Sequence, residues 1–137
     1  MNNAIKELEL FVKVWADSPE QNKKAFVRLK DHIASKPGVN IEFLARTGIT
    51  YSLRAVHVNQ KNKSLFALVD VIEDQPRWLS ICFYSGMISD PDEKGVFIPE
   101  GILGDDAVCF DLEEYNEDEI QYIEARFDEA YQSVTTD

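Results

Sequence analysis

Two arginines and three aromatic residues in the middle of the sequence are the side chains best suited to binding a small molecule. Arg46, Tyr51, Arg54, Trp78 and Tyr84 lie in segments with the alternation or aromatic content of β-strands. If helices cover one face of the sheet, alternate residues on the other face can line a shallow groove, where arginines hold an anion and rings stack. Cross-strand aromatic pairs and arginines covering apolar surface would give the same pattern without a ligand. We take these five residues as ligand-binding candidates.

A group of carboxylates near the C-terminal end of the chain is a second candidate site. Glu113, Glu114, Glu117 and Asp118 lie close together in the sequence, and hard cations prefer such oxygen ligands. The glycine-centred acidic pattern of a calcium loop is absent from the sequence, and a solvated acidic face has the same composition. These four residues are candidate metal ligands, but our first expectation is a protein without a cofactor.

The two cysteines and one of the histidines offer a third arrangement. Cys82 and Cys109 lie inside apolar strand-like runs without CxxC spacing, which predicts two buried, reduced thiols. His57 could neighbour Cys82 or Tyr84 across the sheet. A cysteine-dependent enzyme would also need an orienting group and an oxyanion site, and no motif supplies them. We therefore favour a non-catalytic protein and keep the enzyme as an alternative.

Three amphipathic segments predict the helices that position these residues. Apolar residues recur at helical spacing over residues 4–15. Ser18-Pro19-Glu20-Gln21 matches a capping box and predicts a second helix that runs to about Ser35. Asn116, followed by acids, predicts the start of a C-terminal helix.

Strand-like patterns fill the region between the second and third helices. Five segments show period-two alternation or short apolar, β-prone runs: residues 39–46, 49–56, 65–72, 78–84 and 107–110. The glycine-, proline- and acid-rich stretch 87–106 predicts an irregular loop. Together these segments predict a single α+β domain over residues 1–137. Its antiparallel meander sheet of four to five strands has two N-terminal helices and one C-terminal helix packed on it.

The charge of the protein differs in sign between its two halves. The chain has 137 residues and a formal net charge of −11. Residues 1–64 carry eleven Lys or Arg and six Asp or Glu, a balance of +5, whereas residues 65–137 carry three and nineteen, a balance of −16. We interpret this as two halves that attract each other across the fold, and a homodimer that pairs basic with acidic halves is also compatible.

The composition also narrows the classes of partner. The basic patch of the second helix lacks interleaved aromatic residues, so we do not expect nucleic-acid binding. No run in the sequence approaches the ~18 apolar residues of a membrane span, and the first residues lack the features of a signal peptide. We therefore expect a soluble cytoplasmic protein without a membrane partner.

The order of these elements resembles the YdhG-like bacterial family, which is often grouped with YjbR and frataxin/CyaY proteins. Five segments within about residues 40–133 are similar: residues 48–54, 65–71, 78–84, 90–101 and Glu129-Ala130-Tyr131. Members of that family are mostly uncharacterised, and some are described as frataxin-like iron-binding proteins that support iron–sulfur cluster assembly. Frataxins carry their acidic ridge on the first helix, whereas the carboxylates here gather at the other end of the chain. No ligand residue is therefore carried over.

These observations favour a small domain that binds a partner protein or a small ligand without catalysis. The sheet face and the 87–106 loop are the expected binding surfaces. Besides the cysteine-dependent enzyme, two alternatives stay open: frataxin-like iron binding or delivery, and an acidic regulator that mimics nucleic acid by presenting carboxylates like phosphates.

Overall fold

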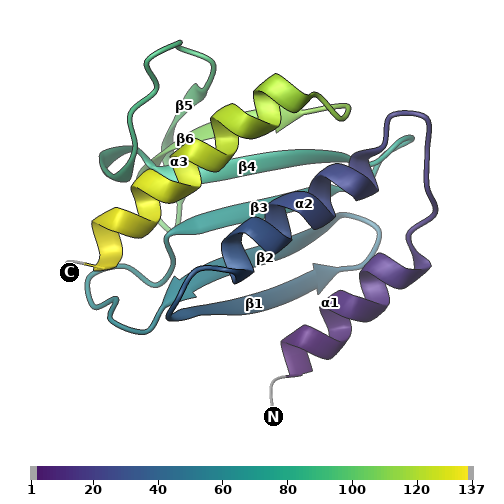
Figure 1. Ribbon diagram of the computed structural model, residues 1–137, viewed down its shortest axis with the longest axis horizontal. Coiled ribbons are helices and arrows are strands. Elements are labelled where there is room, and N and C mark those ends of the chain that lie inside the picture. The colour runs from purple at the N-terminus through teal and green to yellow at the C-terminus, as the bar shows by residue number, and fades with distance from the viewer. Residues whose placement is uncertain (1–2, 136–137) are drawn as a thin grey trace.

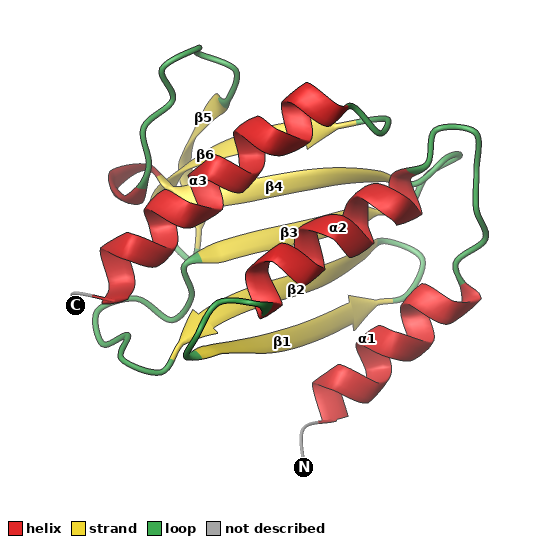
Figure 2. Cartoon of the chain, in the orientation of Figure 1, coloured by secondary structure: helices red, strands yellow, loops and turns green. Residues whose placement is uncertain are grey.

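The computed structural model describes residues 3–135 as three α-helices packed on one face of a six-stranded antiparallel sheet (Figures 1 and 2). This arrangement confirms the predicted α+β class and the placement of two helices before the sheet and one after it. The strand order across the sheet is β1-β2-β3-β4-β6-β5. In chain order the elements are α1 (Asn3–Val14), α2 (Asn22–Ala34), β1 (Val39–Arg46), β2 (Thr50–His57), β3 (Ala67–Ile72), β4 (Trp78–Tyr84), β5 (Val96–Ile102), β6 (Asp105–Leu112) and α3 (Glu117–Thr135).

The first four strands follow the predicted hairpins closely. β1 and β2 pair from Arg46 opposite Thr50 to Val39 opposite His57, around a turn in which Gly48 has a φ of +84° that favours glycine. Burial alternates at every residue of β2, as expected for a sheet covered on one side. β3 begins at Ala67, slightly later than the apolar run predicted.

The stretch 87–106 is not the irregular loop that its composition predicted. It contains β5 and the start of β6, which form a hairpin. β6 lies between β4 and β5, so the order departs from a meander and the sheet has six strands rather than four to five. Pro99 and Gly101 lower the strand propensity of β5, so the sequence pattern did not predict a strand there. They are tolerated because β5 is an edge strand with an irregular register.

The predicted start of the second helix is wrong. α2 begins at Asn22, because Ser18 to Gln21 form a turn in which the Gln21 N–H donates to the Ser18 carbonyl at 3.0 Å. The buried Asn22 amide donates to the carbonyls of Arg77 at 2.6 Å and Glu113 at 2.9 Å. The local capping pattern is therefore not used, and the Asn22 side chain ties the start of the helix to residues far along the chain.

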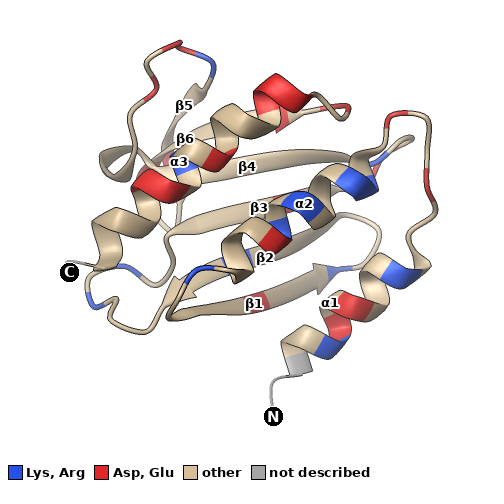
Figure 3. Ribbon diagram, viewed as in Figure 1, with Lys and Arg blue, Asp and Glu red and all other residues tan. Residues whose placement is uncertain are grey.

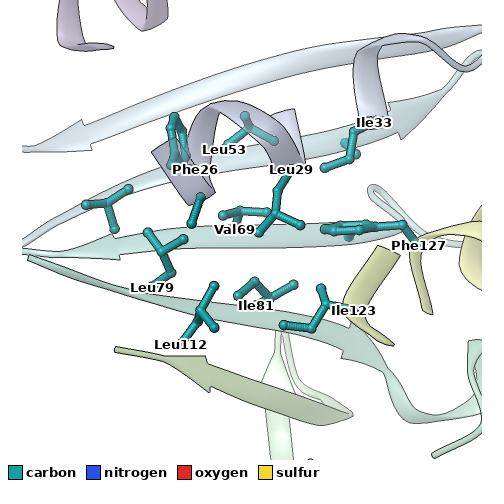
Figure 4. Packing of buried hydrophobic residues seen from close by; sticks show 14 of the residues in the cluster. Phe26, Leu29, Ile33, Leu53, Val69, Leu79, Ile81, Leu112, Ile123 and Phe127 are labelled. Atoms are coloured by element: carbon teal, nitrogen blue, oxygen red, sulfur yellow. The ribbon is translucent and has the colours of Figure 1, made fainter. Parts of the chain in front are cut away.

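The core lies between the sheet and the helices. In Figure 4, side chains of α2 and α3 point toward the strands, and the labelled residues are Phe26, Leu29, Ile33, Leu53, Val69, Leu79, Ile81, Leu112, Ile123 and Phe127. Phe83 of β4 meets Phe127 of α3 edge to face, with ring centroids 5.0 Å apart. No helix within residues 3–135 is long and apolar enough to cross a membrane.

The basic face of α2 pairs with the acidic face of α3 (Figure 3). Arg28 contacts Glu117 at 2.6 Å and Glu124 at 3.0 Å. Asp128 contacts Lys36 at 2.5 Å and the Nε2 atom of His32 at 2.9 Å. The two halves of the chain therefore attract each other across the fold, as their opposite charges indicated.

Replacing Asn22 with alanine should destabilise the protein. Both carbonyls that it satisfies would lose a donor in a buried site, at a cost of about 2–3 kcal/mol in the free energy of unfolding. Urea denaturation measures this change, and Asn40→Ala at an exposed position of β1 is the control. Equal stability of the two variants would contradict the role given to Asn22.

Replacing Glu117 with glutamine should lower the stability of the protein at neutral pH and leave it unchanged in strong acid. The hydrogen bond from Arg28 lowers the pKa of Glu117 from 4.5 to about 2, so its stabilisation is present above pH 4.5 and is lost as pH falls through 2. The Glu117→Gln variant should melt at a slightly lower temperature at pH 7, because this exposed pair is screened by solvent. The difference should vanish near pH 2. Glu114→Gln, at an exposed residue, should follow the wild type at both pH values.

Candidate functional site

The face of the sheet opposite the helices, here called the open face, gathers polar side chains from three strands. Paired residues in neighbouring strands project to the same face. Arg46 lies opposite Thr50, Ser52 opposite Asp70, and Arg54 opposite Leu68. The intervening residues of β2, by contrast, are buried under the helices.

A cavity of about 240 Å³ lies over these side chains. Its floor is formed by β1, β2 and β3, and one wall is formed by the end of β5, with Gly101 and Ile102, and by Leu103 in the turn to β6. β5 is at the opposite edge of the sheet from β1, so the end of its hairpin returns over the open face. Ile102 is 2% exposed and packs there against Leu65 and Leu68. We call this space the open-face cavity.

The two arginines of the open-face cavity have unused hydrogen-bonding capacity. Within residues 3–135, neither Arg46 nor Arg54 forms an ion pair or donates a side-chain hydrogen bond, and the Nε atom of Arg54 is buried without a partner. One carboxylate, that of Asp70, balances their two charges among the lining residues. The open-face cavity therefore carries a local positive charge on a protein whose net charge is −11.

Asp70 is held in place on the floor of the cavity. Its carboxylate accepts a short hydrogen bond from the Ser52 hydroxyl. Burial raises the pKa of Asp70, although that hydrogen bond and the charges of Arg54 and Arg46 oppose the rise. Arg46 and Arg54 can therefore donate to an anion, while Asp70 can accept a hydrogen bond from a neighbouring hydroxyl or amino group.

Tyr51 is not brought to the open face. It is 7% exposed under the helices, and its ring centroid lies 4.5 Å from that of Phe11. Its hydroxyl accepts from the Gly48 N–H and donates to Glu73, both at 3.1 Å. In the predicted hairpin Arg46 and Arg54 occupy even positions and Tyr51 an odd one, and successive residues of a strand point to opposite faces of the sheet. The sequence alone could therefore have placed Tyr51 on the other face from the two arginines.

Trp78 and Tyr84 lie at opposite ends of β4 and do not line the open-face cavity. Trp78 pairs with Ile72, and its indole N–H donates to Asp74 at 3.2 Å. Tyr84 is 4% exposed, and burial raises the pKa of its hydroxyl. The cavity therefore contains both predicted arginines without the three predicted aromatic residues.

The predicted metal ligands are not gathered around one point. Within residues 3–135, no three His, Cys, Asp or Glu side chains are arranged to hold a metal ion. Glu117 is engaged by Arg28 and by Gln121 at 2.7 Å, and Glu113 and Glu114 precede α3 at exposed positions. The metal assignment to Glu113, Glu114, Glu117 and Asp118 stays a prediction from the sequence.

The expectation of two reduced thiols is corrected by the structure. Cys82 of β4 and Cys109 of β6 lie directly opposite each other and form a disulfide. This pairing follows from the position of β6 beside β4, which the sequence pattern did not reveal. His57 lies on the helix-covered face, 5.4 Å from the Tyr131 ring, where its Nδ1 atom accepts from the Asn59 N–H. No Cys–His pair is therefore formed.

Ser52, Asp70 and Leu103 line the cavity and were missed as site residues in the sequence. Ser52 and Asp70 could have been found from the register of two predicted neighbouring strands. Leu103 could not, because its position depends on how the β5–β6 hairpin folds back.

The fold is a two-layer α+β arrangement in which helices cover one face of the sheet and the end of the β5–β6 hairpin covers part of the other. No protein-family model matches the chain, and no match was found among curated proteins or solved structures. The resemblance to the YdhG-like family stays a prediction.

Replacing Asp70 with asparagine should stabilise the protein at neutral pH. Because burial raises the pKa of Asp70 above its usual 3.8, the ionised carboxylate costs folding free energy, and this cost disappears as pH falls and the group is protonated. The Asp70→Asn variant should melt a few degrees higher at pH 7 and like the wild type below pH 3.8. Asp111→Asn, at an exposed residue of the same sheet, should leave the melting temperature unchanged. A lower melting temperature for Asp70→Asn at pH 7 would contradict this account.

Proposed function

We propose that this protein binds a small organic anion in the open-face cavity. The observation that carries the proposal is the pair Arg46 and Arg54: within residues 3–135 neither forms an ion pair or a side-chain hydrogen bond, Asp70 is the single lining carboxylate near them, and the Arg54 Nε atom is buried without a hydrogen-bond partner. A buried donor without a partner costs stability, and an anionic ligand would supply the missing acceptor. The proposal follows the expectation from the sequence that a small ligand binds at the face of the sheet.

The chemistry of the lining residues narrows the class of ligand. The guanidinium forks suit a carboxylate, which they can bind in bidentate fashion. Asp70 and Ser52 suit a hydroxyl or amino group next to that carboxylate. Leu68, Ile102 and Leu103 offer an apolar wall for a short side chain. A 2-hydroxy or 2-amino acid with a branched aliphatic chain combines these features within a cavity of about 240 Å³.

Binding without catalysis agrees best with the groups that line the cavity. No histidine or cysteine is among the lining residues, and the Ser52 hydroxyl donates to a carboxylate without an imidazole to activate it. We infer a carrier, sensor or regulatory domain whose ligand is released unchanged.

The acidic-mimic alternative receives less support from the charge layout. Glu117 and Glu124 form ion pairs with Arg28 of α2, and Asp128 forms one with Lys36 just after α2, so a large part of the acidic face of α3 is neutralised within the molecule. A DNA-mimicking surface would need these carboxylates to be available to a partner.

Titration with 2-hydroxyisocaproate tests the proposed function. Calorimetry should show binding, and amide resonances of residues 46–54 and 101–103 should shift in NMR spectra. Arg54→Ala should weaken the affinity about tenfold or more, since a charge-assisted hydrogen bond contributes about 1.5–3 kcal/mol. Lys6→Ala removes an equal charge from an exposed position on α1 and should have no effect.

A second probe tests the role given to Asp70 and Ser52. The analogue 4-methylpentanoate lacks the hydroxyl and should bind more weakly than 2-hydroxyisocaproate, because Asp70 would lose its donor. Equal affinity for Arg54→Ala and the wild type, or shifts confined to other parts of the protein, would overturn the proposal.

A further inference from the structure

A second cavity, of about 290 Å³, lies on the other side of the sheet between α1, α2 and β1. We call it the helix-face cavity. Figure 1 shows α1 beside β1, at the side of the molecule away from α3. The apolar lining comes from all three elements: Ile5, Leu8 and Val12 of α1, Val27 and Ala34 of α2, and Ile41 of β1.

α1 and α2 pack through aromatic rings near the loop that joins them. There Phe26 contacts Phe11 and Trp15, with ring centroids 6.1 and 5.7 Å apart. Toward the other end of α1, Ile5 is 40% exposed although it faces the cavity. Apolar walls without atoms between them lose dispersion contacts, so an apolar occupant would restore them.

The rim of the helix-face cavity carries charge above the apolar walls. Lys13, Lys30 and Glu9 belong to its lining. Lys30 already pairs with Asp31 at 2.7 Å, whereas Lys13 is exposed and forms no ion pair within residues 3–135. Lys13 is therefore the rim cation that can pair with a negatively charged group at the mouth.

We propose that the helix-face cavity binds a single-chain aliphatic carboxylate, with the chain inside and the carboxylate at Lys13. An aliphatic chain would cover these partly exposed apolar walls, and a volume of about 30 Å³ per methylene, similar to that of one water, gives a chain of about eight to ten carbons. The site shares no lining residue with the open-face cavity. It is therefore independent of the function proposed above.

Decanoate is the probe, used below its micelle concentration. Calorimetry should show binding, and NMR shifts should fall on α1, α2 and β1. Val12→Phe fills the cavity and should weaken decanoate binding at least tenfold. Val14→Phe is the matched control, since the same substitution two residues away lies at a 69% exposed position outside the lining and should bind like the wild type.

Val27→Phe, which fills the cavity from α2, gives an independent variant should Val12→Phe fail to fold by circular dichroism. Lys13→Gln should weaken binding of decanoate and leave that of 1-decanol unchanged, which separates the rim charge from the apolar walls. Equal decanoate binding by a folded filling variant and Val14→Phe would overturn the proposal. Binding to phosphatidylglycerol vesicles without binding to decanoate would overturn it too, because the occupant would then be a lipid surface.

Discussion

One-sided coverage of the sheet is the constraint on which the rest of this structure depends. Leu53 and Val69 are almost fully buried because α2 and α3 exclude water from their face of the sheet. Successive side chains of a strand alternate between faces, so the same packing places Ser52, Arg54 and Asp70 on the other side. The polar open face is thus a direct consequence of how the core is built.

Features with a local cause could be predicted from the sequence. The alternation of β1 and β2 and the β-prone run of β4 predicted nearly correct strand bounds. Burial of one face of a strand makes apolar and polar residues alternate with a period of two, and this pattern is visible in the sequence. Asn116 was correctly identified as the cap of α3, since its side chain accepts from the Glu119 N–H at 3.0 Å. Arg46 and Arg54 were also identified as candidates that share a groove.

Features with a non-local cause could not be predicted. Pro99 and Gly101 lower the strand propensity of β5, and only its position at the sheet edge explains why a strand forms there. The start of α2 is tied by hydrogen bonds from Asn22 to residues far along the chain. Leu103 lines the cavity because the β5–β6 hairpin folds back over the open face. In each case a tertiary contact outweighs the local preference of the residues.

The disulfide between Cys82 and Cys109 has a consequence for the covalent topology of the chain. It closes a ring that spans a sequence separation of 27 and contains all of β5. Cleavage of any one peptide bond inside this ring leaves the N-terminal and C-terminal parts of the protein joined through sulfur. The ring also holds the end of β4 and β6 up to Cys109, so the connection between β5 and β6, which supplies a wall of the open-face cavity, can be nicked without dividing the molecule.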